Sequence, residues 1–217
     1  LKVCVSFLEK IKLFNSNLRI IDEAFEYLIP QVSKKKEGQF FTPRPVEDMV
    51  VKMLNPKSDE FVIDPACGSA GFLLHSVMWV AGGMISGKPL PENARNFAQT
   101  KIYGIDFAKK AVKIAKAINL IVGDGKSHVY KDNSLAPHTW EDETKSGLRG
   151  RLLRFLNDSN KDKENQEKFL FFDFDVLMTN PPFAGTVKER DILRLYMLAE
   201  KNGRWVNKIG RHILFLE

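Results

Sequence analysis

Residues 61–72 read Phe-Val-Ile-Asp-Pro-Ala-Cys-Gly-Ser-Ala-Gly-Phe, and this stretch decides the fold. Its apolar start predicts a short strand, and the small residues after Asp64 predict a sharp turn into a helix at 72–80. The free N–H groups that open such a helix favour an anionic group. Asp64, at the end of the strand, is placed to meet a ligand ammonium group. A glycine-containing turn of this kind is also compatible with tight packing alone.

Strands and helices alternate along the chain around that stretch. Further strands are predicted at 101–105, 128–130 and 174–179, and an amphipathic helix is predicted at 108–122. This order is typical of an α/β fold with parallel strands and helices on both faces of the sheet. Ligands of such sheets bind beyond the carboxyl ends of the strands.

Three stretches fall outside this alternation. Residues 3–29 carry apolar side chains at helical spacing and predict a packing helix, with a lysine-containing linker after it. Residues 82–96 contain several glycines and prolines and predict a loop. Residues 140–168 are highly charged and predict an exposed excursion, with a short helix near 148–156.

Polar residues follow the second and third predicted strands. A carboxylate at Asp106 can accept both hydrogen bonds of a ribose diol, or it can cap the helix that begins near Ala108, and the two roles are compatible. Asp132 and Asn133 are equally placed to contact a cofactor adenine, and a plain turn is the alternative there.

The fourth predicted strand leads into Asn180-Pro181-Pro182-Phe183. A side-chain amide, two stiff prolines and an aromatic ring form a rigid polar notch beside a stacking surface. Such a notch suits a flat heterocycle that carries an exocyclic amine. Two prolines after a strand are also an ordinary way to end one.

Composition sets broad limits on the class of protein. The chain has 217 residues, a net charge of +6 and 44% apolar residues, which suits one domain, or one domain with part of another, and is compatible with nucleic acid. No apolar run reaches the length of a membrane span, and no signal peptide opens the chain. Two cysteines, Cys4 and Cys67, do not make a disulfide framework, so a reducing, intracellular location is expected. The first residue, Leu1, and the apolar helical pattern before Glu217 suggest a fragment.

Four segments together resemble the S-adenosylmethionine-dependent DNA adenine-N6 methyltransferases, above all the modification subunits of type I restriction–modification systems. Their order matches the families in which cofactor motifs precede the catalytic one, and the resemblance covers about residues 20–217. The four segments are Gly38-Gln39-Phe40-Phe41-Thr42-Pro43-Arg44, Asp64-Pro65-Ala66-Cys67-Gly68-Ser69-Ala70-Gly71-Phe72, Tyr103-Gly104-Ile105-Asp106 and Asn180-Pro181-Pro182-Phe183.

The resemblance implies an α/β, Rossmann-like methyltransferase sheet that is incomplete at its C-terminal end. Residues 1–35 would end a helical N-terminal domain, and residues 36–217 would form the truncated catalytic domain. The implied cofactor is S-adenosyl-L-methionine, with no metal. The implied partners are double-stranded DNA with a flipped adenine and the specificity and restriction subunits of a type I complex. A cytoplasmic location in a bacterial or archaeal cell, without a membrane contact, is also implied.

The resemblance also assigns site residues by position. The catalytic residues would be Asn180, Pro181, Pro182 and Phe183. The cofactor-binding residues would be Gln39, Phe40, Phe41, Thr42, Pro43, Arg44, Asp64, Ala66, Gly68, Ser69, Ala70, Gly71, Asp106 and Asn133. The sequence departs from the family pattern in three places: Ala70 replaces a common glycine, Asp106 a frequent glutamate, and Asn133 a frequent acid.

Three other functions compete with this interpretation. One is a stand-alone or fused restriction–methylation adenine methyltransferase, which a specificity domain on the same polypeptide would reveal. Another is a methyltransferase for RNA or for a protein glutamine amide, which shares Asn-Pro-Pro but usually ends it with tyrosine. Phe183 and residues 40–43 argue against that one. The third is a non-catalytic cofactor-binding or assembly module, and the intact set of motifs argues against it for the full protein.

Overall fold

The computed structural model describes residues 42–83, 90–122, 127–153 and 171–217. The helix predicted at 3–29, the linker after it and three predicted site residues, Gln39, Phe40 and Phe41, lie outside these ranges. Within them, no helix is long and apolar enough to cross a membrane.

The core of the fold is a sheet of four parallel strands in the order β3-β2-β1-β6. Its strands are β1 (Val62–Asp64), β2 (Ile102–Asp106), β3 (Val129–Lys131) and β6 (Val176–Leu177). The predicted positions and the parallel arrangement are thereby confirmed. The strand predicted at 174–179 is shorter than expected, because β6 contains only Val176 and Leu177, and the Leu177 side chain is 48% exposed.

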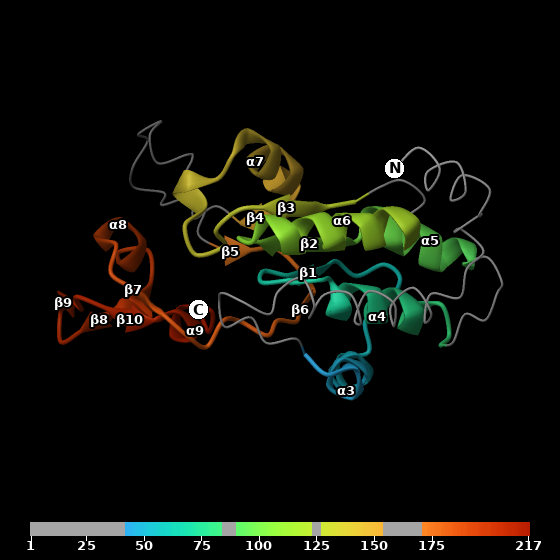
Figure 1. Ribbon diagram of the computed structural model, residues 1–217, viewed down its shortest axis with the longest axis horizontal. Helices are drawn as coiled ribbons and strands as arrows, with labels where there is room; N and C mark the ends of the chain where they lie inside the picture. The colour runs from blue at the N-terminus through green and yellow to red at the C-terminus, as the bar shows by residue number, and fades with distance from the viewer. Residues whose placement is uncertain (1–41, 84–89, 123–126, 154–170) are drawn as a thin grey trace, which may run out of the picture.

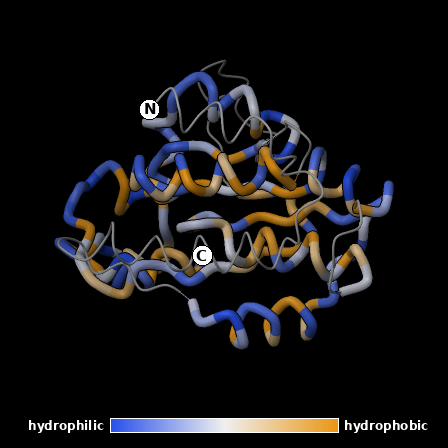
Figure 2. The backbone as a smooth tube through the Cα atoms, turned by 45° about the vertical axis from the view of Figure 1, so that its right-hand side comes forward, coloured by the Kyte–Doolittle hydropathy of each residue, from blue (hydrophilic) through white to orange (hydrophobic). Residues whose placement is uncertain are grey.

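One face of the sheet packs against three helices, α4 (Gly71–Val80), α5 (Glu92–Thr100) and α6 (Lys109–Val122). Side chains alternate between faces along a strand, so Val62, Ile102 and Val129 all enter the core on this side. In α6, Val112, Ala115, Ile118 and Val122 are buried at helical spacing, which explains why the lysine-rich sequence still folds as a helix here. Figure 2 shows hydrophobic residues concentrated in the central strands and the helices beside them.

The opposite face is covered mainly by aromatic side chains and by α7 (Asp142–Leu148). Ile63, Tyr103 and Tyr130 point to this side and pack with Trp140 and Leu148. The prediction of helices on both faces is confirmed. The predicted position of the short helix, near 148–156, was wrong. Acidic residues in its first turn and the buried pair Thr144 and Leu148 place the helix earlier.

The chain then leaves α7 through the 3₁₀ turn η3 (Arg149–Arg151) into β4 (Leu152–Leu153), which pairs antiparallel with β5 (Phe171–Phe172). The predicted loop at 82–96 was also partly wrong, because α5 begins at Glu92. Pro91 precedes that helix, and Ala94, Phe97 and Ala98 bury its inner face.

Two further elements belong to the described fold. Helix α3 (Arg44–Leu54) packs against α4 and ends at Asn55, which adopts a left-handed conformation (φ 52°). The 3₁₀ turn η2 (Pro137–Thr139) lies between β3 and α7. In Figure 1, α3 lies below α4, and the C-terminal elements gather at the left.

Residues 184–217, here named the C-terminal module, form a small unit of short elements. They are β7 (Thr186–Val187), α8 (Arg190–Leu193), η5 (Met197–Ala199), β8 (Glu200–Lys201), β9 (Arg204–Trp205), β10 (Ile209–Gly210) and α9 (Arg211–Leu214). Strands β7 and β10 pair antiparallel, and Asn202-Gly203, both at positive φ, turn β8 into β9. A small core containing Val187, Leu193 and Leu214 joins Leu135, so the module packs on the segment after β3.

Candidate active site

A cavity of about 680 Å³ lies beyond the carboxyl ends of the parallel strands. Both groups of predicted site residues line it. The cofactor group contributes Thr42, Asp64, Ala66, Gly68, Ser69, Gly71, Asp106 and Asn133, and the catalytic group contributes Asn180, Pro181, Pro182 and Phe183. Pro43, Arg44 and Ala70 are described but do not line the cavity. The cavity is therefore lined by residues that are far apart in the sequence, from Thr42 to Phe215.

The turn after β1 bends sharply at the base of the cavity. The Asp64 carboxylate accepts a hydrogen bond from the Ala66 N–H at 3.0 Å, and the Cys67 N–H donates to the Ile105 carbonyl at 2.9 Å. Ala70 has φ +69°, a conformation that costs a residue with a Cβ about 1–2 kcal/mol. Ala70, where the sequence resemblance predicts glycine, therefore adopts this conformation at an energetic cost.

Asp64 is almost fully buried at this turn, at 2% exposure. Removal from water disfavours the charged carboxylate and raises the pKa of Asp64 to about 7. A cationic ligand group in the cavity would favour the charged form again.

Asp106 holds two backbone segments at the end of β2. One carboxylate oxygen accepts from the Gly68 N–H at 2.9 Å, and the other accepts from the Ala108 N–H at 2.7 Å. The second bond forms a turn just before α6, and the predicted capping of the helix N–H groups by Asp106 stays a prediction. Burial raises the pKa of Asp106. Because a carboxylate has about four acceptor positions, these two bonds are compatible with a further contact to a diol, which stays a prediction.

The segment after β3 places Asp132 and Asn133 at the cavity wall. Asp132 accepts hydrogen bonds from the Asn133 N–H at 3.1 Å and the Glu141 N–H at 2.9 Å. The Asn133 side-chain oxygen accepts from the Leu135 N–H at 3.1 Å. The turn predicted here is confirmed, and the choice between the two residues as an adenine contact stays open.

A hydrogen bond joins the two halves of the site. The Asn180 amide nitrogen donates to the Thr42 hydroxyl oxygen at 3.1 Å, across 138 positions of sequence. In this arrangement the nitrogen end of the amide faces Thr42, and the oxygen end points away from it. Phe183 presents an aromatic ring that is 60% exposed, with the His212 ring 6.3 Å away between centroids.

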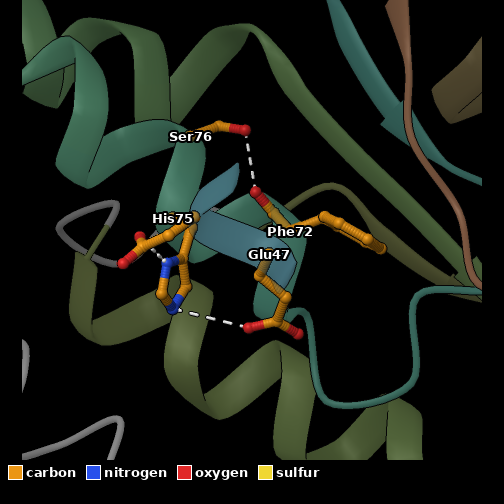
Figure 3. A network of polar contacts seen from close by, with 5 residues as sticks. Glu47, Phe72, His75 and Ser76 are labelled. Atoms are coloured by element: carbon orange, nitrogen blue, oxygen red, sulfur yellow. Dashed lines mark hydrogen bonds and ion pairs between the residues drawn. The ribbon is translucent and has the colours of Figure 1, made fainter. Parts of the chain in front are cut away.

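The sequence did not predict the polar network between α3 and α4 (Figure 3). His75 on α4 contacts two carboxylates of α3, with Nδ1 2.6 Å from Asp48 and Nε2 3.4 Å from Glu47. Glu47 lines the cavity, and its carboxyl group occupies the space where a Cβ on Gly71 would lie. A side chain at position 71 would therefore displace the Glu47 carboxyl group from its place beside His75. The adjacent acids of α3 are visible in the sequence, but nothing there pairs them with His75.

The charge around the cavity is strongly uneven. Five acidic side chains line it, Glu47, Asp64, Asp106, Asp132 and Glu189, against two cations, Lys110 and Arg211. Such a lining favours a ligand with positive groups. Among the described residues, no group of three or more His, Cys, Asp or Glu side chains is placed to hold a metal ion.

Residues 17–206 match the family model described as N-6 DNA Methylase. The chain belongs to this family. The match confirms the resemblance that the four sequence motifs indicated, with similar limits along the chain.

Curated relatives include both type II and type I enzymes. The chain is 31% identical over 98 residues to the type II restriction enzyme and methyltransferase RM.BcgI of Heyndrickxia coagulans, covering 45% of this chain and 15% of that protein. It is 26% identical over 171 residues to the methylase subunit of the type I restriction enzyme StySPI of Salmonella potsdam, covering 78% of this chain and 28% of that subunit. The chain thus spans less than a third of either relative.

Solved structures show the same fold. A type I restriction-enzyme modification subunit from Vibrio vulnificus YJ016 has a TM-score of 0.56 at 23% identity, covering 92% of this chain and 33% of that one. A class I S-adenosylmethionine-dependent methyltransferase from Listeria monocytogenes has a TM-score of 0.58 at 16% identity, covering 96% of this chain and 51% of that one. The predicted Rossmann-like methyltransferase sheet is thereby confirmed for this chain.

Proposed function

We propose that this chain carries the active site of a DNA methyltransferase that moves a methyl group from S-adenosyl-L-methionine to adenine N6. The observation that carries the proposal is the single cavity lined by both the turn after β1 and the Asn-Pro-Pro-Phe segment. One side of that cavity suits a nucleoside cofactor, and the other suits an amine-bearing base.

The residues at the strand ends fit the proposed cofactor. Asp64 faces the cavity with a carboxyl group that ionises readily beside an ammonium group, and Asp106 lies one strand further, where a ribose diol would bind. A Cβ on Gly68 would meet no atom within 4 Å, so the turn leaves open space on that side. When bound, the cofactor supplies an electrophilic methyl group on a sulfonium.

Asn180 and Pro181 would activate the amine of the base. Adenine N6 is a weak nucleophile because its lone pair is delocalised into the ring. Acceptors on both N–H groups favour a pyramidal nitrogen, and the Asn180 side-chain oxygen and the Pro181 carbonyl supply them. Thr42 holds the amide nitrogen of Asn180 and so orients that oxygen. Neither acceptor is a base at neutral pH, so proton loss follows methyl transfer, and catalysis rests on positioning and electrostatics.

Phe183 would hold the base by stacking. Its ring is 60% exposed beside the cavity, where a flat heterocycle can cover it. Stacking of a base on an aromatic side chain contributes ~1–3 kcal/mol. Since N6 is buried in duplex DNA, the target adenine must leave the stack to reach Asn180.

We propose a type I modification subunit as the full protein, acting with specificity and restriction subunits on double-stranded DNA. The similarity to type I methylase subunits over 78% of the chain supports this. A fused restriction–methylation enzyme is the second candidate, because the 31% identical relative is a type II restriction enzyme and methyltransferase. Sequencing the gene on both sides of this chain distinguishes the two, since the second requires nuclease or target-recognition domains on the same polypeptide.

The test of the proposed activity is Asn180→Ala in the full-length protein, assembled with its partner subunits. Transfer of labelled methyl groups from S-adenosyl-L-methionine to DNA should fall by at least about a hundredfold, while cofactor affinity by calorimetry stays unchanged. Asn93→Ala, an exposed asparagine of α5 outside the cavity, is the matched control and should retain activity. Near-normal methylation by Asn180→Ala would overturn the assignment.

A further inference from the structure

The C-terminal module carries an excess of exposed positive charge. Residues 184–217 contain seven Lys and Arg residues and four Asp and Glu residues, and all seven cations are exposed. Exposed cations that exceed the local acids indicate an anionic partner.

The acids of the module are mostly engaged within the fold. Glu217 accepts hydrogen bonds from the N–H groups of Met197 and Leu198 at 2.8 and 2.9 Å. Asp191 contacts His138 at 3.0 Å, and Glu189 accepts from the Lys188 N–H at 2.9 Å. In the described part of the chain, no Lys or Arg of the module takes part in an ion pair. Among these acids, Glu189 has its pKa lowered by hydrogen bonds from backbone N–H groups and, to a smaller extent, by the positive charge of the nearby Arg211. Most of the positive charge of the module is therefore not offset by ion pairs with its own acids.

One of these cations lies at the active site itself. Arg211 lines the cavity. Its backbone N–H donates a hydrogen bond to the Gly185 carbonyl at 3.2 Å. A Cβ on Gly185 would lie 3.3 Å from the Nε and Cζ atoms of Arg211. The guanidinium group thus lies against the loop that directly follows Asn180-Pro181-Pro182-Phe183.

That position matters because the cavity is otherwise acidic. Five carboxyl groups line it, and the other lining cation, Lys110, lies on α6 beside the cofactor-binding turns. A nucleotide that enters beside Phe183 brings a backbone phosphate toward this acidic lining. A cation on the catalytic side offsets that repulsion, and the planar fork of arginine matches two phosphate oxygens.

We infer that Arg211 binds a backbone phosphate that flanks the flipped adenine. The inference rests on the proposed function and adds to it a positioning residue for the DNA strand. Arg211 contacts no reacting atom. It fixes the sugar–phosphate backbone at the mouth of the site, so that the base reaches Asn180 in one orientation.

The test uses the full-length enzyme with its partner subunits and a duplex containing an adenine that methylation mapping has identified as its target. Arg211→Ala should raise the Kd and KM for DNA about tenfold and leave cofactor affinity unchanged. The slope of log Kd against log salt concentration should become shallower by about 0.9, the loss of one phosphate contact. Arg211→Lys should keep that slope. Lys113→Ala, an exposed cation of α6 that does not line the cavity, should match the wild type.

A second duplex locates the contact. Neutral methylphosphonate linkages at the two phosphates that flank the target adenine should weaken wild-type binding by the same factor and weaken Arg211→Ala no further. Two results would refute the inference. One is a slope of log Kd against log salt concentration that is the same in Arg211→Ala as in the wild type. The other is a duplex with methylphosphonate linkages that weakens DNA binding by Arg211→Ala as much as it weakens binding by the wild type. If the wild type itself transfers no methyl group to DNA, the proposed function fails instead, and the inference fails with it.

Discussion

Acidification should weaken cofactor binding through Asp64. Burial raises the pKa of this carboxyl group to about 7, so in the cofactor-free protein it is protonated below neutral pH. The ammonium group of the cofactor interacts more strongly with the ionised form than with the neutral one. Binding therefore shifts the pKa of Asp64 downward and releases a proton at pH values below 7.

The magnitude follows from that pKa. Below pH 7 the ionised fraction falls tenfold for each pH unit, so the Kd should rise tenfold per unit until the neutral carboxyl binds as well as the remaining ionised fraction. A hydrogen bond to a charged group contributes about 1.5–3 kcal/mol, which limits the total loss to about ten- to hundredfold. Above about pH 8, where the carboxyl group is almost fully ionised, the contribution of Asp64 to the affinity should be constant.

Isothermal titration calorimetry of the full-length protein with S-adenosyl-L-methionine measures this directly. Titrations in buffers of different ionisation enthalpy, from about pH 5 to about pH 8, give both the Kd and the protons released. Asp64→Asn should bind with the low-pH affinity at every pH. Asp59→Asn, an exposed aspartate outside the cavity, should keep the wild-type pH dependence. Burial also raises the pKa of Asp106, so Asp106→Asn measures how much that second acid contributes to the pH dependence of the Kd.

Two results would refute the reasoning. A Kd that is constant across this range would show that Asp64 does not change its ionisation on binding. A pH dependence that persists unchanged in Asp64→Asn would assign it to another group.

Two further variants test the cofactor site and the packing of the sheet. Asp106→Ala should weaken cofactor affinity about tenfold or more, because it removes the proposed diol contact and leaves the N–H groups of Gly68 and Ala108 without their acceptor. Unchanged affinity by calorimetry would contradict the ribose assignment. Gly147→Ala should lower stability by about 1–3 kcal/mol in thermal unfolding, because the new Cβ would overlap the Tyr130 hydroxyl. Gly150→Ala, whose Cβ meets no atom within 4 Å, is its control, and equal melting temperatures for the two variants would speak against the described packing of α7.

The parallel sheet could be predicted because its strands are short apolar runs, each followed by a polar residue at its carboxyl end. The helices whose predicted positions were wrong depend on contacts with residues outside their own sequence. Helix α5 begins right after Pro91, where a glycine- and proline-rich stretch masks its start, and its identity rests on Phe97 reaching the core. Helix α7 buries only Thr144 and Leu148, which is too weak a pattern to distinguish it from an exposed segment.

The same distinction holds at the candidate site. Asp64, Asp106 and Asn180 could be predicted to lie together, because parallel strands end at one edge of the sheet. Glu47 and His75 could not, because their contact depends on how α3 packs across α4. Arg211 belongs to the C-terminal module, whose short strands carry almost no periodic signal in the sequence.

The hydrogen bond from Asn180 to Thr42 has a thermodynamic consequence for the two proposed ligands. Thr42 precedes α3 and is a proposed cofactor contact, and Asn180 is a proposed contact of the base, so this one bond would link the two proposed sites. A cofactor that changes the position of Thr42 changes the orientation of the Asn180 amide. Binding linkage then requires reciprocity: whatever factor the cofactor applies to the affinity for a flipped adenine, the adenine applies to the affinity for the cofactor. A protein that holds its methyl donor would therefore search DNA with a different affinity from one that has just released its product.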